Sequence, residues 1–204
     1  YEKIKRGFKT SNIVGIVHAT GTGKSFNALE YVSDNTNENI LYVVPYLGII
    51  EHLKSIIAAS GFDLEKDFPN LKFCTYMSFV NLSREELKNI KVDTLILDEF
   101  HHLGAPVWGA RINTLIETHS NIKVLGMTAY TVRDRNTPYE RDMANPDTDE
   151  LFSNHIVSKY DLCDAMVDGV LPKPIYKTAY VTLIEDVDYL EKRLAKLDHN
   201  SSKY

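Results

Sequence analysis

Five short runs of apolar, mostly β-branched residues recur along the first two thirds of the chain. They lie at residues 13–17, 40–44, 71–75, 94–97 and 123–126. Each run is apolar almost throughout, which is typical of a strand that is buried on both faces of a parallel sheet. The runs therefore predict a mainly parallel sheet.

Between these runs the apolar residues follow helical spacing. The segments with this pattern span residues 24–32, 48–59, 84–89 and 107–118. Ser83, with Glu86 three residues later, has the pattern of a capping box and places the start of the third helix. Strands that alternate with helices in this way predict a doubly wound α/β fold, with helices on both faces of the sheet.

The character of the sequence changes after Tyr130. Residues 131–149 are polar and charged, and we expect a long loop there. Further segments are predicted as a helix at 161–168, a turn at Gly169, an extended stretch at 174–183 and a helix at 185–197. We therefore expect one domain over residues 1–183 and, over residues 184–204, the helical start of a linker to a second domain.

Composition places the chain among globular proteins without a membrane span. Hydrophobic residues make up 44% of the chain and charged residues 25%, which is ordinary for a soluble core. No apolar run approaches the roughly 20 residues that cross a bilayer. The start, residues 1–8, is charged and helical in pattern, so we expect no signal peptide in this segment.

Cysteine content and net charge bear on the cellular location and on the way in which the chain could bind nucleic acid. Cys74 and Cys163 each lie in an apolar stretch, which predicts two buried thiols rather than a disulfide framework, and hence a cytoplasmic location. The formal net charge is −5 and the pI about 5.8. This balance argues against any nucleic-acid-binding role that depends on a broad basic surface.

A glycine-rich turn stands between the first predicted strand and the first helix. Its residues are His18, Ala19, Thr20, Gly21, Thr22, Gly23, Lys24 and Ser25. Phosphate binding needs such a turn, because glycines let backbone N–H groups point inward and the helix N-terminus adds partial positive charge. Lys24 is expected to reach the β- and γ-phosphates of ATP, and the Ser25 hydroxyl to ligate Mg²⁺. The strict pattern has glycine where this chain has His18.

The fourth apolar run ends in two carboxylates, Asp98 and Glu99. Side chains that follow parallel strands gather at the carboxyl edge of the sheet, so Asp98 should emerge near Lys24 and Ser25. We expect Asp98 to hold Mg²⁺ through water and Glu99 to orient or deprotonate the attacking water. Alone, such a pair is more often a solvated turn, and the phosphate loop upstream favours the functional interpretation.

The paired histidines after this motif do not predict a zinc site. His101 and His102 are adjacent, so their side chains diverge on any regular element, and no Cys or His partner stands at zinc spacing.

These motifs resemble those of superfamily 2 helicases and translocases. The loop at 18–25 is similar to motif I in the form typical of type I and type III restriction motor subunits and excision-repair helicases. Asp98-Glu99-Phe100-His101 resembles a DEAH-type motif II. Further segments match motif Ia at 44–46, motif Ib at 75–76, motif III with its following arginine at 126–133, and the next segment of the restriction-like branch at 162–174. The resemblance covers about residues 12–180.

The resemblance implies a first RecA-like ATPase domain and roles for several more residues. The coupling residues it implies are His101, Thr128, Ala129 and Arg133. The nucleic-acid contacts it implies are Pro45, Tyr46 and Thr75, all three of which also suit turn and core positions. The sequence departs from the family pattern at His18, Phe100 and Tyr130, and it contains neither the adenine-reading glutamine motif nor a second RecA-like domain with arginine fingers.

The leading interpretation is the ATP-binding domain of an ATP-dependent helicase or translocase, directed to DNA rather than RNA and weakly active as this fragment. Such domains grip phosphates with backbone amides and hydroxyls, which needs no basic surface. A degenerate domain that serves as a nucleotide switch or scaffold is an alternative, which Tyr130 favours and the intact motif residues oppose. A P-loop kinase is a third possibility, but it leaves residues 126–133 unexplained. We find no carboxylate cluster that would indicate an endonuclease.

Overall fold

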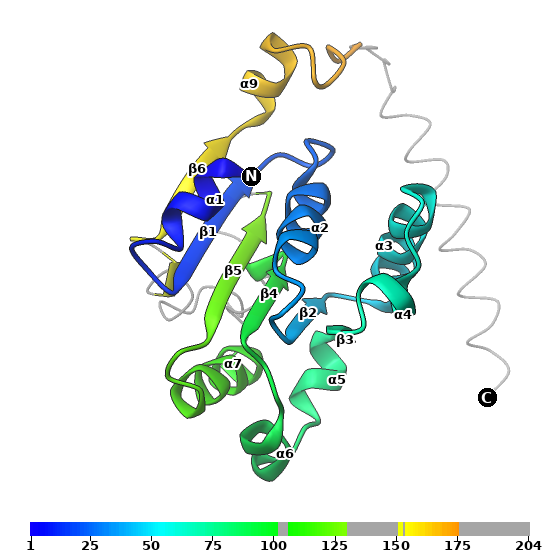
Figure 1. Ribbon diagram of the computed structural model, residues 1–204. Helices are drawn as coiled ribbons and strands as arrows, with labels where there is room; N and C mark the ends of the chain where they lie inside the picture. Colours follow the sequence, from blue (N-terminus) through cyan, green and yellow to red (C-terminus); the bar gives the residue numbers. More distant parts are fainter. Residues whose placement is uncertain (102–105, 130–150, 153, 176–204) are drawn as a thin grey trace, which may run out of the picture. The chain divides into compact units, whose positions relative to one another are not determined.

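Parallel strands form a sheet in the order β3-β2-β4-β5-β1-β6 (Figure 1). The computed structural model describes residues 1–101, 106–129, 151–152 and 154–175. Within them, the strands are β1 (Ile13–His18), β2 (Ile40–Val44), β3 (Leu71–Thr75), β4 (Thr94–Asp98), β5 (Lys123–Thr128) and β6 (Ile156–Tyr160). The predicted mainly parallel α/β sheet is confirmed.

The helices follow the strands in the alternation that the sequence predicts. They are α1 (Glu2–Gly7), α2 (Lys24–Asp34), α3 (Leu47–Ala59), α4 (Leu64–Asp67), α5 (Tyr76–Val80), α6 (Arg84–Asn89), α7 (Pro106–Thr118) and α9 (Leu162–Val167). The capping box of α6 is present, with Glu86 N donating to Ser83 and Ser83 N donating to the Glu86 carboxylate. Residues Tyr1–Leu171 cluster as one compact unit, which holds all these elements.

Three elements were not predicted, and each has a physical reason. Helices α4 and α5 are single turns of 4 and 5 residues, too short to show a helical period. Strand β6 pairs only with β1 and alternates little in burial, because it lies at the edge of the sheet. Its sequence, Ile-Val-Ser-Lys-Tyr, therefore lacks the continuous apolar run that marks the inner strands.

Two hydrophobic cores cover the two faces of the sheet. Along β2, Tyr42 and Val44 face one core while Leu41 and Val43 face the other, as the two-residue period of a strand requires. The first core is closed by side chains of α1, α2 and α3, and the second by side chains of α5, α6 and α7. This two-sided burial explains why the inner strands read as apolar throughout.

The strand register brings the carboxyl ends of the strands into one row. Val44 pairs with Thr75, Asp98 pairs with Met127, and Thr128 pairs with Val17. The predicted proximity of the strand at 94–97 to the strand at 13–17 takes the form of β4 and β1 flanking β5. The ends of β3, β2, β4, β5 and β1 thus follow one another along the edge where α/β sheets bind ligands.

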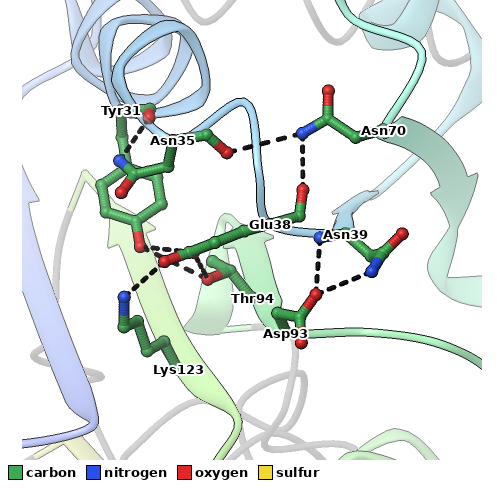
Figure 2. A network of polar contacts seen from close by, with 8 residues as sticks. All are labelled: Tyr31, Asn35, Glu38, Asn39, Asn70, Asp93, Thr94 and Lys123. Atoms are coloured by element: carbon green, nitrogen blue, oxygen red, sulfur yellow. Dashed lines mark hydrogen bonds and ion pairs between the residues drawn. The ribbon is translucent and has the colours of Figure 1, made fainter.

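A polar network ties the opposite, amino edge together (Figure 2). The Glu38 carboxylate accepts hydrogen bonds from the Tyr31 hydroxyl on α2 (3.0 Å), the Thr94 hydroxyl on β4 and the Lys123 ammonium on β5. Beside it, the Asp93 carboxylate accepts from the backbone and side-chain N–H groups of Asn39, both at 2.7 Å. The network fixes the loop before β2 against the starts of β4 and β5.

The two cysteines differ in environment. Both are free thiols. Cys74, on β3, is half-buried, and burial raises the pKa of its thiol to about 12. Cys163, on α9, is exposed, so the expectation of two buried thiols was wrong. The apolar neighbours of Cys163 lie on a short surface helix.

Several expectations fall on residues outside the described ranges. These are the loop at 131–149, the extended stretch beyond residue 175, the helix at 185–197, and the residues His102, Tyr130 and Arg133. In the part of the chain that is described, no helix combines the length and hydropathy needed to cross a membrane.

Candidate functional site

The turn between β1 and α2 has the backbone of a phosphate-binding loop. Gly21 and Gly23 adopt positive φ angles of 84° and 88°, a conformation that glycine reaches without a steric penalty. Gly23 is the N-cap of α2 and supplies no side-chain cap to it. The N–H groups at the start of this 11-residue helix therefore face the loop without a competing side chain from the cap position.

Lys24 lies within this loop rather than in solvent. The residue is 8% exposed, and its Nζ donates to the backbone oxygen of His18 at 3.1 Å. The same nitrogen is 3.9 Å from Oε1 of Glu99. The loop and the acidic motif, which are far apart in the sequence, therefore meet at this ammonium group.

The acidic pair is held in an unusual backbone conformation. Glu99 has a φ of 50°, the one positive value outside glycine in the described residues. Its backbone N–H donates to Oδ1 of Asp98 at 3.1 Å. A positive φ in a residue with a Cβ costs energy and is often found at functional sites. Here it turns Glu99 away from the strand direction that Asp98 still follows.

The two carboxylates are in contrasting electrostatic environments. Asp98 is 5% exposed, and burial together with the charge of Glu99 raises its pKa to about 6. Burial also raises the pKa of Glu99, but the hydrogen bond with His101 and the charge of Lys24 outweigh it, so the net shift is downward. Neighbouring acids whose pKa values are pushed apart are common where one of them takes part in proton transfer.

Three of the four predicted coupling residues gather around Glu99. Its Oε2 accepts from the Thr128 hydroxyl at 3.2 Å and from the Ala129 N–H at 3.3 Å. Nδ1 of His101 is 2.8 Å from the Thr128 hydroxyl and 3.3 Å from Oε2 of Glu99. The fourth, Arg133, lies outside the described residues. The end of β5 thus supports the carboxylate directly.

Tyr42 is a site residue that the sequence did not reveal. It is fully buried on β2, and its hydroxyl makes no hydrogen bond of normal geometry among the described residues. Burial and the charge of Asp98 raise its pKa well above the usual range, while the nearby Ser25 hydroxyl lowers it by a smaller amount. The Tyr42 hydroxyl is therefore under the electrostatic influence of the Asp98 carboxylate. In the sequence, Tyr42 stands inside the apolar run at 40–44 and cannot be distinguished from a core residue.

His18 is accounted for by the unpredicted strand β6. Its Nε2 is 2.9 Å from the Ser158 hydroxyl, and its ring lies edge-on to Tyr160, with 5.9 Å between ring centroids. The next residue, Ala19, donates its backbone N–H to the backbone oxygen of Tyr160 at 2.9 Å. The departure from glycine at position 18 thus serves to attach the loop to the edge strand.

Phe100, the other departure that the structure describes, is a core residue. It is 4% exposed and stacks on Phe152, with 4.3 Å between ring centroids. Both rings pack against Gly126, where a Cβ would lie 2.5 Å from Phe152 and 2.9 Å from Phe100. The segment after the acidic pair is therefore anchored in the core.

The proposed nucleic-acid contacts lie at the ends of β2 and β3 but differ in accessibility. Tyr46 is 65% exposed, whereas Thr75 is 7% exposed. The Thr75 hydroxyl caps α5 by accepting from Ser78 N at 3.1 Å. Pro45 is half-buried between β2 and Tyr46. Tyr46 alone among the three presents a largely free side chain.

The site fits ATP and Mg²⁺ by the chemistry of its donor groups. An uncapped helix start, two glycines with positive φ and one buried ammonium group suit phosphate oxygens. The buried carboxylate of Asp98, at the end of β4, and the hydroxyl of Ser25, at the start of α2, are oxygen groups of the kind that suit a hydrated Mg²⁺.

The chain is similar to a known protein family and, more distantly, to solved structures. A structural match is domain III of the replication initiation protein DnaA from Thermotoga maritima, with a TM-score of 0.44 and 17% sequence identity, covering 78% of this chain and 60% of that one. A search of curated proteins finds no match. The family described as "Type III restriction enzyme, res subunit" matches residues 1–133 of the 204, a region that carries both motifs and forms an ATP-binding, helicase-like domain. The chain therefore belongs to the type III restriction enzyme res subunit family.

Proposed function

We propose that this chain is the first RecA-like domain of an ATP-driven motor that moves on nucleic acid, with DNA as the track. The observation that carries the proposal is the 3.9 Å approach of Lys24 Nζ to Glu99 Oε1. It unites a phosphate loop and an acidic motif at the carboxyl edge of a parallel sheet, where P-loop ATPases hold their nucleotide.

The residues of the phosphate loop and of the acidic pair have separate roles in the proposed hydrolysis of ATP. Bound ATP and Mg²⁺ supply the transferable phosphoryl group and a cation that offsets its charge. The N–H groups of residues 19–25 and the Lys24 ammonium hold the β- and γ-phosphates, while Ser25 and, through water, Asp98 hold the cation. Glu99 orients the attacking water and accepts its proton. Its lowered pKa keeps it ionised at neutral pH, as a base must be.

Coupling to nucleic acid is proposed to run through the strand ends beside this site. His101, Thr128 and Ala129 hold the Glu99 carboxylate. A movement at the end of β5 therefore displaces this carboxylate, which is the proposed catalytic base. The exposed Tyr46 ring at the end of β2 offers a surface on which a nucleic-acid base can stack. Pro45 and the backbone around Thr75 complete the proposed track.

A second RecA-like domain is proposed to complete the motor. Among the described residues, none of the contacts to Lys24 or Glu99 involves an arginine. An arginine finger contributes about 10³–10⁵ in rate to related phosphoryl transfers. Residues 1–204 alone should therefore bind ATP but hydrolyse it slowly, with weak stimulation by DNA. Brisk, DNA-stimulated turnover by this chain would contradict the proposed division of labour.

One experiment separates the motor from its two alternatives. The full-length protein is incubated with radiolabelled ATP, Mg²⁺ and single-stranded DNA, and released phosphate is measured beside label transferred to any acceptor. Phosphate release that DNA stimulates supports the motor. Tight ATP binding without release would indicate a nucleotide switch, which the Tyr130 departure favours. Transfer of label to an acceptor would indicate a kinase.

A further inference from the structure

Tyr76 reaches from the end of one strand to the acidic motif of another. It is the first residue of α5 and directly follows β3. Its side chain is fully buried, and its hydroxyl donates to the backbone oxygen of Asp98 at 3.0 Å. Because β2 lies between β3 and β4 in the sheet, the tyrosine bridges two strands that do not pair with each other.

The ring and the hydroxyl of Tyr76 are both fixed. The ring stacks on Trp108 of α7, with 5.1 Å between centroids and 9° between planes. Burial, followed by the charges of Asp98 and Glu99, raises the pKa of Tyr76 well above its usual range. The hydroxyl therefore stays protonated and remains a hydrogen-bond donor. A clamped ring of this kind holds its acceptor in one position.

The acceptor is the carbonyl oxygen that precedes Glu99. It belongs to the peptide bond between Asp98 and Glu99. The orientation of that peptide plane fixes the backbone nitrogen of Glu99 and therefore the direction in which the Glu99 side chain leaves the strand. Glu99 has a φ of 50°, a conformation that persists only when its surroundings hold it. The Tyr76 hydroxyl is one of the groups that hold it from outside β4.

We propose that Tyr76 is a positioning residue that fixes the Asp98–Glu99 peptide and links the strand ends that face the nucleic-acid track to the catalytic Glu99. The inference rests on the proposed function, in which Glu99 acts on the attacking water. Tyr76 touches neither the nucleotide nor the water in this scheme, and it acts through the backbone of the acidic pair.

Few residues separate Tyr76 from the proposed nucleic-acid contacts. Thr75, which precedes Tyr76, is the N-cap of α5 and pairs with Val44 at the end of β2. Met77, which follows Tyr76, is 61% exposed, and Tyr46 beyond Val44 is 65% exposed. A nucleic-acid strand that contacts Met77 bears directly on α5, and one that contacts Tyr46 bears on Thr75 through its pairing with Val44. Displacement of α5 then changes the hydrogen bond to the Asp98 carbonyl.

The test is a pair of matched Tyr→Phe variants in the full-length protein. Tyr76→Phe keeps the ring and removes the hydroxyl that bonds to the end of β4. Tyr31→Phe removes a hydroxyl near the start of the same strand, where it lies 3.3 Å from Thr94 and 3.0 Å from the Glu38 carboxylate. Both variants lose one buried hydroxyl, so they control for a general loss of stability. ATP hydrolysis is measured with and without a single-stranded oligo(dT), beside the affinity for a non-hydrolysable ATP analogue.

The expected result separates positioning from folding. For Tyr76→Phe we expect kcat to fall about three- to tenfold, the usual yield of one hydrogen bond, and the stimulation by oligo(dT) to shrink. Analogue affinity and KM for ATP should stay at the wild-type value. Tyr31→Phe should lower the unfolding midpoint and leave kcat and stimulation unchanged.

Other outcomes overturn the inference in recognisable ways. Equal kcat and equal stimulation in Tyr76→Phe and Tyr31→Phe would remove Tyr76 from the mechanism while leaving the proposed function intact. A parallel loss of analogue affinity in Tyr76→Phe would show a structural defect of the whole site and contradict a positioning role. If the wild-type protein itself hydrolyses no ATP, the proposed function fails and this inference fails with it.

Discussion

Nζ of Lys24 donates to the backbone oxygen of His18 at 3.1 Å while it faces the Glu99 carboxylate at 3.9 Å. The ammonium group is thus engaged at the mouth of the loop by two oxygen atoms of the protein. Phosphate oxygens that bind between them offer more negative charge than either partner. The Lys24 side chain can therefore change partners without leaving the loop.

Replacing Lys24 should greatly weaken ATP binding. Lys24→Ala removes the cation that faces the β- and γ-phosphates, and a charge-assisted hydrogen bond contributes on the order of 1.5–3 kcal/mol. We expect the affinity for Mg²⁺–ATP to fall tenfold or more in titration calorimetry. Lys54→Ala is the matched control, because Lys54 pairs with Glu51 on the exposed surface of α3. Unchanged affinity in Lys24→Ala would refute the assignment of the loop.

A methyl group at Gly126 should destabilise the fold. A Cβ there would lie 2.5 Å from Phe152 and 2.9 Å from Phe100, two rings stacked on each other. Overpacking of this kind costs about 1–3 kcal/mol, so the urea midpoint of Gly126→Ala should fall. Gly48→Ala is the control, because its Cβ meets only ordinary contacts and lies within α3. A helical alanine should leave stability equal or slightly higher.

The sequence alone allowed the inner strands of the sheet and the residues of the phosphate loop to be predicted. The strands inside the sheet, β1, β2, β4 and β5, are almost wholly apolar because both of their faces are covered, and they were identified from their composition. The edge strand β3 was identified in the same way, because its apolar run is interrupted only by the exposed Lys72 before Thr75. The phosphate loop is also local, because its function depends on glycines, a lysine and a serine that are adjacent in the chain.

The rest of the site depends on contacts between distant segments, which no local pattern encodes. The position of His18 is explained only by Ser158 and Tyr160 on an edge strand whose sequence is partly polar. Tyr42 and Tyr76 lie in apolar surroundings and look like core residues in the sequence. Only the pairing of β2 with both β3 and β4 brings the Tyr76 hydroxyl to the backbone oxygen of Asp98 and places Tyr42 beside these strands.

The Glu38 network should make stability depend on pH at the acid end. Burial raises the pKa of Glu38, but hydrogen bonds from Lys123, Thr94 and Tyr31 outweigh it, so the folded-state pKa lies below the ordinary value of 4.5. The unfolded state therefore takes up this proton first as pH falls. The stabilisation is complete above about pH 4.5 and is lost as pH drops through the lower, folded-state pKa.

The variant Glu38→Gln tests this directly. At pH 7 it leaves Lys123 without its carboxylate partner, and we expect a loss of about 1–3 kcal/mol in the free energy of unfolding. The difference from wild type should shrink steadily below pH 4.5, measured by urea unfolding at several pH values. Glu51→Gln, at an exposed ion pair, should change stability little throughout. A Glu38→Gln difference that stays constant down to pH 3 would contradict the linkage.

Substitution of Glu99 separates an enzyme from a nucleotide switch. Glu99→Gln keeps the shape of the side chain and its capacity to accept from Thr128 and Ala129, but it removes the base. Lys24, Ser25 and Asp98 hold the phosphates and the cation without it, so ATP affinity should stay within a few-fold of wild type. Hydrolysis by the full-length protein should fall by about 10²–10⁴-fold, the usual contribution of a positioned general base.

The opposite outcome has a definite meaning. If Glu99 is only an acidic residue in a turn, neither ATP affinity nor turnover will change in Glu99→Gln. The structure argues against that, because a solvated turn needs neither a positive φ nor contacts from Lys24, His101, Thr128 and Ala129 to one carboxylate. Steady-state ATPase assays and analogue binding on the same preparation decide the matter. Because the Gln side chain preserves most of these contacts, a large loss of turnover at unchanged affinity identifies the lost proton acceptor as its cause.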